Sequence, residues 1–253
     1  MKAHTKEKLQ ALKLPAFIEV FNEISLNTQQ SLTLEEALTM MVEREAIQRD
    51  NKRLMRLLKS AKLRYPNACV SDIDYKQSRQ FNHEQVRQLT HCEWIKQHKN
   101  IIFTGPAGTG KSYFACALAQ QACQMSYKVR YLRVTRLVEQ LRLSHADGSY
   151  GKTLEQFAKL DLIVLDDWGI DQLDRQARRD LLEVLEDRYA KASTIITTQL
   201  PIDKWHHFIG DDTIADAICD RVANNAYIIE VNGESMRKSE TLTHVGHLVE
   251  SKF

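Results

Sequence analysis

A glycine-rich run near the middle of the chain constrains the fold more than any other feature. It fits the pattern G-x-x-x-x-G-K-[ST] and consists of Gly105, Pro106, Ala107, Gly108, Thr109, Gly110, Lys111 and Ser112. Ile101–Phe103 before it reads as a buried strand, and Tyr113–Gln121 after it reads as a helix rich in Ala and Leu. A loop between a strand and a helix N-terminus points backbone N–H groups and the helix dipole at phosphate oxygens. We therefore expect a nucleoside triphosphate site, with Lys111 on the β- and γ-phosphates and the Ser112 hydroxyl on Mg²⁺.

Length and composition leave room for one large α/β domain and a smaller one. The chain has 253 residues, of which 43% are hydrophobic and 27% charged, and its net charge is +2. No apolar stretch is long enough to cross a bilayer, and the N-terminus is polar, so we expect a cytoplasmic protein without a membrane partner. The cysteines form no C-x-x-C pair, which favours reduced thiols over a metal cage or disulfides: Cys69, Cys92, Cys116, Cys123 and Cys219.

Residues 1–70 predict a small helical domain. Thr33 and Glu36 form a capping box at the start of a long helix. That helix is expected to end before Pro66, whose ring disfavours helix at the preceding residue. A shorter helix is expected before it, interrupted at Pro15, and a linker after it at about residues 66–80.

The long helix carries basic residues at steps of three and four, which places them on one face. Between Arg49 and Arg64 there are seven basic residues and a single acid, Asp50. Two readings stay open, a solvated helix surface or a stripe that tracks DNA phosphates. The candidate DNA-binding residues of this stripe are Arg49, Lys52, Arg53, Arg56, Lys59 and Lys62.

Residues 71–253 predict the second domain, in which strands alternate with helices. This alternation favours a parallel sheet covered by helices on both faces. The expected strands are Ile101–Thr104, Val129–Val134, Leu162–Asp166, Thr194–Thr198 and Tyr227–Val231.

Polar residues at the ends of two expected strands are the candidate catalytic groups. Leu162–Leu165 is a buried strand that delivers Asp166 and Asp167 to the sheet edge where α/β ligands bind. Asp166 would hold the magnesium, and Asp167 would polarise the water that attacks the γ-phosphate. Thr198 and Gln199, at the end of the next strand, could hydrogen-bond that water or the γ-phosphate.

The sequence of the chain resembles the IstB-type helper ATPases of insertion-sequence transposons. The glycine loop, the two aspartates and several longer segments carry this resemblance. That family lies within the AAA+ class, near the DnaC helicase loaders and DnaA initiators. The resemblance covers most of the chain and includes Leu12–Pro15, Glu43–Glu45, Arg49–Ala61, Gly105–Ser112, Leu165–Gly169, Ile195–Pro201 and Cys219–Val222.

The resemblance implies a P-loop AAA+ ATPase domain with ATP and Mg²⁺ as cofactors. It implies that Asp166 and Asp167 form the acidic pair and that Thr198 with Gln199 is the sensor. Arg221 corresponds to an arginine finger that serves a neighbouring subunit, and Arg237 to a further nucleotide sensor. Most AAA+ proteins have Asp-Glu where this chain has Asp-Asp. Only 32 residues follow Arg221 (253 − 221), too few for the usual helical lid, so a neighbour is expected to close the site.

The family also implies a DNA-facing helical element after the second strand. The candidate contacts there are Arg130, Arg133 and Arg136, with Lys128 and Arg142 nearby. Since no base-reading motif accompanies them, we expect binding with weak sequence preference.

The resulting expectation is an ATP-dependent helper that oligomerises on double-stranded DNA, promoted by ATP and DNA, and recruits or activates a transposase. The alternative is a DnaC-like loader that grips single-stranded DNA and a replicative helicase. A small-molecule kinase is disfavoured, because the paired Asp residues and the arginine finger suit hydrolysis at a subunit interface.

Overall fold

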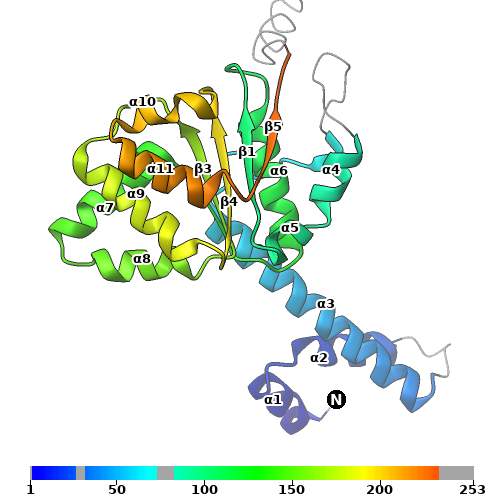
Figure 1. Cartoon of the computed structure of the whole chain (residues 1–253). Coiled ribbons are helices and arrows are strands. Elements are labelled where there is room, and N and C mark those ends of the chain that lie inside the picture. The colour runs from blue at the N-terminus through cyan, green and yellow to red at the C-terminus, as the bar shows by residue number, and fades with distance from the viewer. Residues whose placement is uncertain (1, 27–31, 73–82, 234–253) are drawn as a thin grey trace, which may run out of the picture. The chain divides into compact units, whose positions relative to one another are not determined.

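A computed structural model of the chain describes residues 2–26, 32–72 and 83–233 (Figure 1). Its internal contacts separate two compact units, Met1–Arg56 and Leu57–Phe253. This division falls inside a long helix, whereas the sequence places a domain boundary near residue 70; that boundary stays a prediction. None of the helices in the described ranges is long and apolar enough to span a membrane.

The first unit is helical and contains α1 (Ala3–Ala11), α2 (Pro15–Leu26) and most of α3 (Leu34–Ala61). Pro15 opens α2 as its first residue, where its missing N–H costs nothing, so it separates two helices instead of interrupting one. The capping box forms as predicted, with Thr33 N–H donating to Glu36 Oε2 (2.8 Å) and Glu36 N–H donating to Thr33 Oγ1 (3.3 Å).

Glu45 holds α3 to the start of α2. Its side chain is buried, and Oε2 accepts a hydrogen bond from the Ala16 N–H (3.1 Å), while Oε1 pairs with Arg49 Nε (2.8 Å).

Helix α3 ends at Ala61 because Lys62 adopts a left-handed backbone (φ 51°). The sequence predicts a helix that runs on toward Pro66, whereas Lys62 lies just past the helix and not on it.

The second unit is built on a parallel sheet of five strands in the order β2-β3-β4-β1-β5. Their bounds are β1 Asn100–Thr104, β2 Val129–Arg133, β3 Leu162–Trp168, β4 Ser193–Thr198 and β5 Ala226–Glu230. Strand β4 lies between β1 and β3. The glycine loop after β1 and the aspartates at the end of β3 therefore meet at one edge, with the end of β4 between them.

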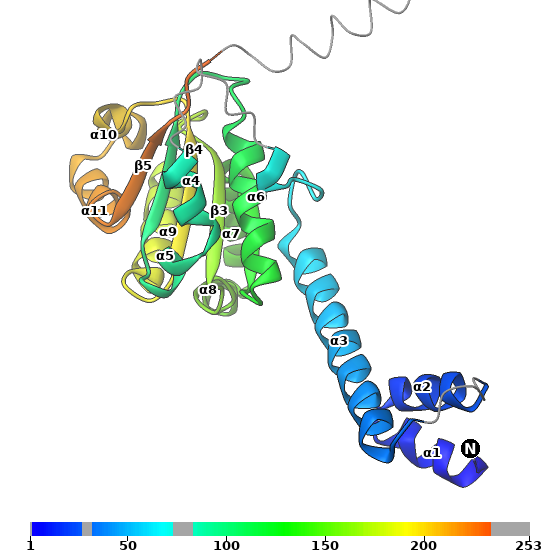
Figure 2. The same cartoon turned by 90° about the vertical axis from the view of Figure 1, so that its right-hand side faces the viewer.

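Helices cover both faces of this sheet, as predicted. Helix α6 lies on one face, and α9 and α11 lie on the other (Figure 2). The helices of this unit are α4 His83–Thr90, α5 Glu93–Lys96, α6 Lys111–Gln124, α7 Val134–Ala146, α8 Tyr150–Ala158, α9 Arg175–Arg188, α10 Trp205–Ile209 and α11 Asp212–Val222, with short 3-10 turns at Val70–Asp72 and Ile202–Lys204.

Alternating side chains of the central strands build the two cores. Ile163, Leu165 and Ile196 are fully buried on the α9 side, while Phe103 packs on Phe114 of α6 with ring centroids 4.8 Å apart. Both faces are apolar, as buried parallel strands require.

Gly105, the first residue of the glycine loop, is needed for close packing. Its φ is +139°, and a Cβ placed on it would lie 2.2 Å from the carbonyl oxygen of Val231. That backbone cannot move freely, because the Val231 N–H donates to the Thr104 carbonyl (2.8 Å).

We predict that Gly105→Ala lowers the free energy of unfolding by about 1–3 kcal/mol through backbone strain. This corresponds to about 2–4 °C in Tm for each kcal/mol. The matched control is Gly151→Ala in α8, where an added Cβ meets nothing within 4 Å. Thermal unfolding should leave the control unchanged or slightly more stable; equal loss in both variants would contradict the strain.

Candidate nucleotide-binding site

The glycine loop joins β1 to α6 in the geometry that phosphate binding requires. Gly108 and Gly110 have φ of 84° and 98°, and Gly110 precedes the first residue of α6. Lys111 is buried, and its Nζ donates to the carbonyls of Gly105 (2.7 Å) and Pro106 (2.6 Å). Thr109 Oγ1 also donates to Pro106 (2.9 Å). The loop is therefore held around its lysine at the positive end of the helix dipole.

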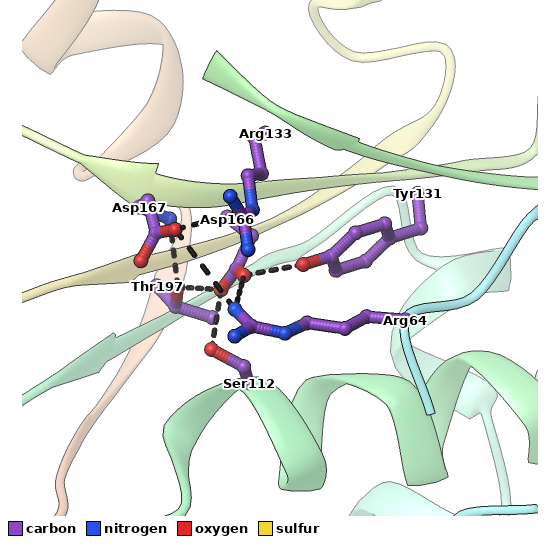
Figure 3. A network of polar contacts seen from close by, with 7 residues as sticks. All are labelled: Arg64, Ser112, Tyr131, Arg133, Asp166, Asp167 and Thr197. Atoms are coloured by element: carbon purple, nitrogen blue, oxygen red, sulfur yellow. Dashed lines mark hydrogen bonds and ion pairs between the residues drawn. The ribbon is translucent and has the colours of Figure 1, made fainter. Parts of the chain in front are cut away.

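Asp166 lies at the centre of a polar network, and its side chain is completely buried (Figure 3). Its Oδ1 accepts hydrogen bonds from Ser112 Oγ (2.7 Å) and from the Thr197 hydroxyl. Its Oδ2 accepts from the Tyr131 hydroxyl and pairs with Arg64 Nη1 (3.4 Å). Burial, together with the facing Asp166 carboxylate, raises the pKa of Tyr131, so this hydroxyl keeps its proton and remains a donor.

Asp167 follows Asp166 at the edge of this network, where the strand is irregular (Figure 3). Its φ is 62°, and the register between β3 and β4 shifts between Leu165 and Trp168. Such a bulge re-aims a side chain, and left-handed backbone in a residue other than glycine marks local strain. The Asp167 N–H donates to Thr197 Oγ1 (3.2 Å), which holds the turn.

The charges around Asp167 are mixed. Arg133 Nε lies 3.5 Å and Arg64 Nη1 4.0 Å from its Oδ2. Burial, together with the neighbouring Asp166 carboxylate, raises the pKa of Asp167, and the charges of Arg133, Arg64 and Lys111 oppose this rise. A half-buried carboxylate with a raised pKa is a suitable acceptor for a proton from water.

A cavity of about 440 Å³ opens between the glycine loop and the Asp167 carboxylate. This volume is in the range of small-molecule and cofactor sites. Its lining combines the loop with the ends of β3 and β4 and the segment after α3, and includes Arg64, Tyr65, Lys111, Ser112, Arg133, Asp167, Trp168, Thr197, Thr198 and Gln199.

The polar residues at the end of β4 make different contacts, and the sensor role of Thr198 and Gln199 stays a prediction. Thr198 and Gln199 line the cavity, but the Thr198 hydroxyl is engaged by the backbone, donating to the Trp168 carbonyl (2.9 Å) and accepting from the Leu200 N–H (3.0 Å). Thr197, one residue earlier, hydrogen-bonds to both aspartates. The sequence predicts this strand but does not single out Thr197, because alternation of Thr with apolar residues is ordinary strand composition.

Two further residues of the network escape sequence reasoning as well. Tyr131 reaches Asp166 from the neighbouring strand β2, and only the register of the strands reveals this. Arg64 is the last member of the basic run in the sequence, but its side chain enters the cavity.

Arg221 lies on α11, near the amino ends of β1 and β4. Its carbonyl accepts from Asn100 Nδ2 (3.3 Å), while its guanidinium donates to Glu186 and to the Ala217 carbonyl (2.7 Å). The glycine loop lies at the carboxyl end of β1. Arg221 therefore lies at the other end of the strands from the glycine loop of its own subunit. Arg237 lies outside the described residues.

The basic stripe is exposed to solvent along its length. Arg49 pairs with Glu45 and donates to the Lys13 carbonyl (3.1 Å), and Arg56 Nε donates to the Lys52 carbonyl (3.3 Å). The exposed members are Arg49, Lys52, Arg53, Arg56, Lys59 and Lys62.

The basic residues on and after β2 are more dispersed than the expectation of a single DNA-facing element. Arg130 is half-buried, and its Nη1 donates to the Ser60 carbonyl at the end of α3 (2.9 Å). Arg133 faces Asp167. Arg136 is exposed and pairs with Glu139 (2.7 Å), and Arg142 pairs with Asp174 (2.6 Å).

Comparison with known proteins gives one family and a consistent set of relatives. The model of the IstB-like ATP binding protein family matches residues 7–243. The putative ATP-binding protein of insertion sequence IS1162 from Pseudomonas fluorescens is 46% identical over 202 residues, which are 79% of this chain and 87% of that protein. The putative insertion sequence ATP-binding protein y4pL from Sinorhizobium fredii is 42% identical over 242 residues, 95% of this chain and 98% of that protein.

Solved structures share the fold at lower identity. DnaI matches with a TM-score of 0.56 and 20% identity over 71% of this chain and 92% of that chain. The DnaC helicase loader matches with a TM-score of 0.53 and 20% identity over 67% of this chain and 99% of that chain. These likenesses confirm the expected P-loop AAA+ fold.

We predict opposite effects of Asp167→Asn on hydrolysis and on stability. Asn keeps the shape and tolerates left-handed backbone, but loss of the proton acceptor should slow ATP hydrolysis by about 100-fold or more. Because the folded state holds the proton of Asp167 more tightly than the unfolded chain, ionising this group at neutral pH costs stability. The variant should therefore have a higher Tm at about pH 7, and the difference should shrink toward about pH 4, the ordinary carboxyl range.

The matched control is Asp171→Asn, an exposed residue of the following loop. Thermal unfolding across this pH range and a phosphate-release assay give both readouts. A variant that hydrolyses ATP at the wild-type rate would rule out Asp167 as the acceptor.

Proposed function

The chain belongs to the family of IstB-like ATP-binding proteins, and on that premise we propose that it is the ATP-dependent helper of a transposase. It is a P-loop ATPase of a family whose relatives are named for insertion sequences. We propose further that it oligomerises on double-stranded DNA in the presence of ATP, that it recruits or activates the transposase, and that it acts in the cytoplasm.

The observation that carries the proposal is the contact between Ser112 of the glycine loop and the buried Asp166 (2.7 Å). A hydroxyl and a carboxylate are the hard oxygen donors that Mg²⁺ accepts beside phosphate oxygens and water, so these residues fit that ion. When bound, Mg²⁺ would neutralise charge on the β- and γ-phosphates. Thr197 and Tyr131 keep the Asp166 carboxylate oriented toward the loop.

The remaining roles follow from position. The loop amides and Lys111 hold the phosphates, and Asp167 accepts a proton from the attacking water at its Oδ2. Arg221, at the opposite edge of the sheet from its own loop, serves the site of a neighbouring subunit. Hydrolysis removes the γ-phosphate that this arginine contacts, so ATP turnover loosens the assembly.

DNA contact is assigned to the exposed basic stripe on α3, with Lys62 just past the end of the helix, and Arg136 is a second candidate. Lysines and arginines of this kind bind phosphates and give affinity without reading bases. Arg130 and Arg133 are weaker candidates, because the first donates to Ser60 and the second faces Asp167.

A DnaC-like loader of single-stranded DNA is the alternative. DnaI and DnaC share the fold at 20% identity, which does not extend to partners. The higher identity to insertion sequence ATP-binding proteins favours the helper. Preference for single-stranded over duplex DNA in the presence of ATP would support the loader instead.

We predict complementation between two inactive variants if Arg221 acts on a neighbour. Lys111→Ala should lose ATP binding and ATP-dependent assembly, whereas Arg221→Ala should bind ATP but hydrolyse it poorly. An arginine finger contributes about 10³–10⁵-fold to the rate. In a mixture, the ATP of an Arg221→Ala subunit can meet Arg221 of a Lys111→Ala neighbour.

Phosphate release by the two variants alone and mixed in equal amounts, with DNA present, is the measurement. The mixture should exceed the sum of the separate rates. No gain on mixing, with both variants folded and associating, would remove the finger assignment. Retained ATP binding by Lys111→Ala would overturn the site itself.

We predict that duplex DNA binding weakens steeply with salt and that Arg53→Ala lowers the steepness. Removing one cation that neutralises a DNA phosphate reduces the slope of log K against log salt by about 0.9. Arg44→Ala is the matched control, because Arg44 already pairs with Glu23 (3.3 Å) on the same unit. Affinities of a random duplex between low and physiological salt test this. An affinity independent of salt would exclude the phosphate-tracking stripe.

A further inference from the structure

Arg64 places a permanent positive charge at the acidic pair from a distant part of the chain. Its Nη1 lies 3.4 Å from Asp166 Oδ2 and 4.0 Å from Asp167 Oδ2 (Figure 3). The pair joins residues 102 positions apart. The Arg64 side chain is 27% exposed at the cavity, whereas that of Asp166 is not exposed at all.

The two carboxylates need a counter-charge, because adjacent anions in a partly buried site repel one another. Arg64 supplies that charge to the Oδ2 side of Asp166, while Ser112 occupies the Oδ1 side. A divalent cation held by Ser112 and Asp166 would supply more charge to the same carboxylate. Two cations beside one carboxylate repel, so Arg64 and the metal ion oppose each other's binding.

The segment that carries Arg64 follows the end of α3 in the chain and contacts the start of α6. The Arg64 guanidinium lies over the Tyr65 ring (5.5 Å to the centroid), and the Tyr65 and Tyr113 rings are 5.7 Å apart. The Cys69 N–H donates to the Tyr113 hydroxyl (3.4 Å). Displacement of Arg64 therefore acts on residues 62–72, which directly follow the last turn of α3.

We propose that Arg64 is a positioning residue that holds the acidic pair until Mg²⁺ takes its place. Metal binding with ATP then releases Arg64 and the segment 62–72. This proposal rests on the proposed function, since it requires ATP and Mg²⁺ in the cavity. In this proposal, binding of ATP and Mg²⁺ changes the conformation of the segment after α3. That segment directly follows the helix that bears the basic stripe.

The test is the Mg²⁺ requirement of nucleotide binding. Binding of a fluorescent ATP analogue is titrated with MgCl₂, from chelated solution upward, for wild type, Arg64→Gln and Arg64→Lys. Removing the competing charge should lower the half-maximal Mg²⁺ concentration of Arg64→Gln by about tenfold, a change of about 1.4 kcal/mol. Arg64→Lys keeps the charge and should stay near wild type. The control is Arg87→Ala, an exposed arginine on α4 that pairs with Glu84.

A second readout is hydrogen exchange of residues 62–72 in ATP with chelator and in ATP with Mg²⁺. Wild type should exchange faster in this segment once Mg²⁺ is added, and Arg64→Gln should exchange fast in both conditions. This comparison uses the wild-type protein and remains decisive if a variant fails to fold.

The results of these experiments distinguish exchange of Arg64 with Mg²⁺ from a role of Arg64 as a phosphate ligand and from failure of the proposed function. An unchanged Mg²⁺ requirement in folded Arg64→Gln overturns the exchange. Weaker nucleotide binding at every Mg²⁺ concentration also overturns it, because Arg64 would then be a phosphate ligand. Failure of the wild-type protein to bind the analogue at all would instead refute the proposed function.

Discussion

The buried carboxylate of Asp166 is the constraint on which the nucleotide site depends. Removing a charge from water costs several kcal/mol unless it is paired and hydrogen-bonded. Hydrogen-bond donors from four separate parts of the second unit compensate for this lost hydration. They are Arg64 after α3, Ser112 at the start of α6, Tyr131 on β2 and Thr197 on β4. The strand order β2-β3-β4-β1 brings three of these elements to the end of β3. A shift in any one of them would leave a charge or a hydroxyl unpaired in the interior.

The backbone of the neighbouring Asp167 is strained, whereas the Asp166 carboxylate is fully hydrogen-bonded. The bulge at the end of β3 turns the second carboxylate into the cavity, where burial and Asp166 raise its pKa. The Thr197 hydroxyl accepts from the Asp167 N–H and donates to Asp166, so one side chain orients both acids. The network that stabilises the first carboxylate thereby holds the second in a conformation that an isolated strand would not adopt.

Much of the ATPase fold could be predicted from local patterns. The five strands, the helix after the glycine loop and the capping box at Thr33 match the structure, because each depends on periodicity or on residues a few positions apart. Local patterns fail where a residue's role depends on what lies opposite it. They favour Thr198, whose hydroxyl serves the backbone, over Thr197, and they miss that Arg130 donates to Ser60. Lys62 leaves the helix through a left-handed backbone that no pattern indicates.

The sequence by itself determined that this chain binds a nucleotide phosphate, since the spacing of Gly105 to Ser112 between a strand and a helix is a local arrangement with few uses. It also determined the family, through segments spread over most of the chain. Only the tertiary structure decided which distant side chains surround Asp166, that Arg133 faces Asp167, and that Arg64 enters the cavity. The physical reason is that strand order and register bring together residues whose separation along the chain carries no information about their contact.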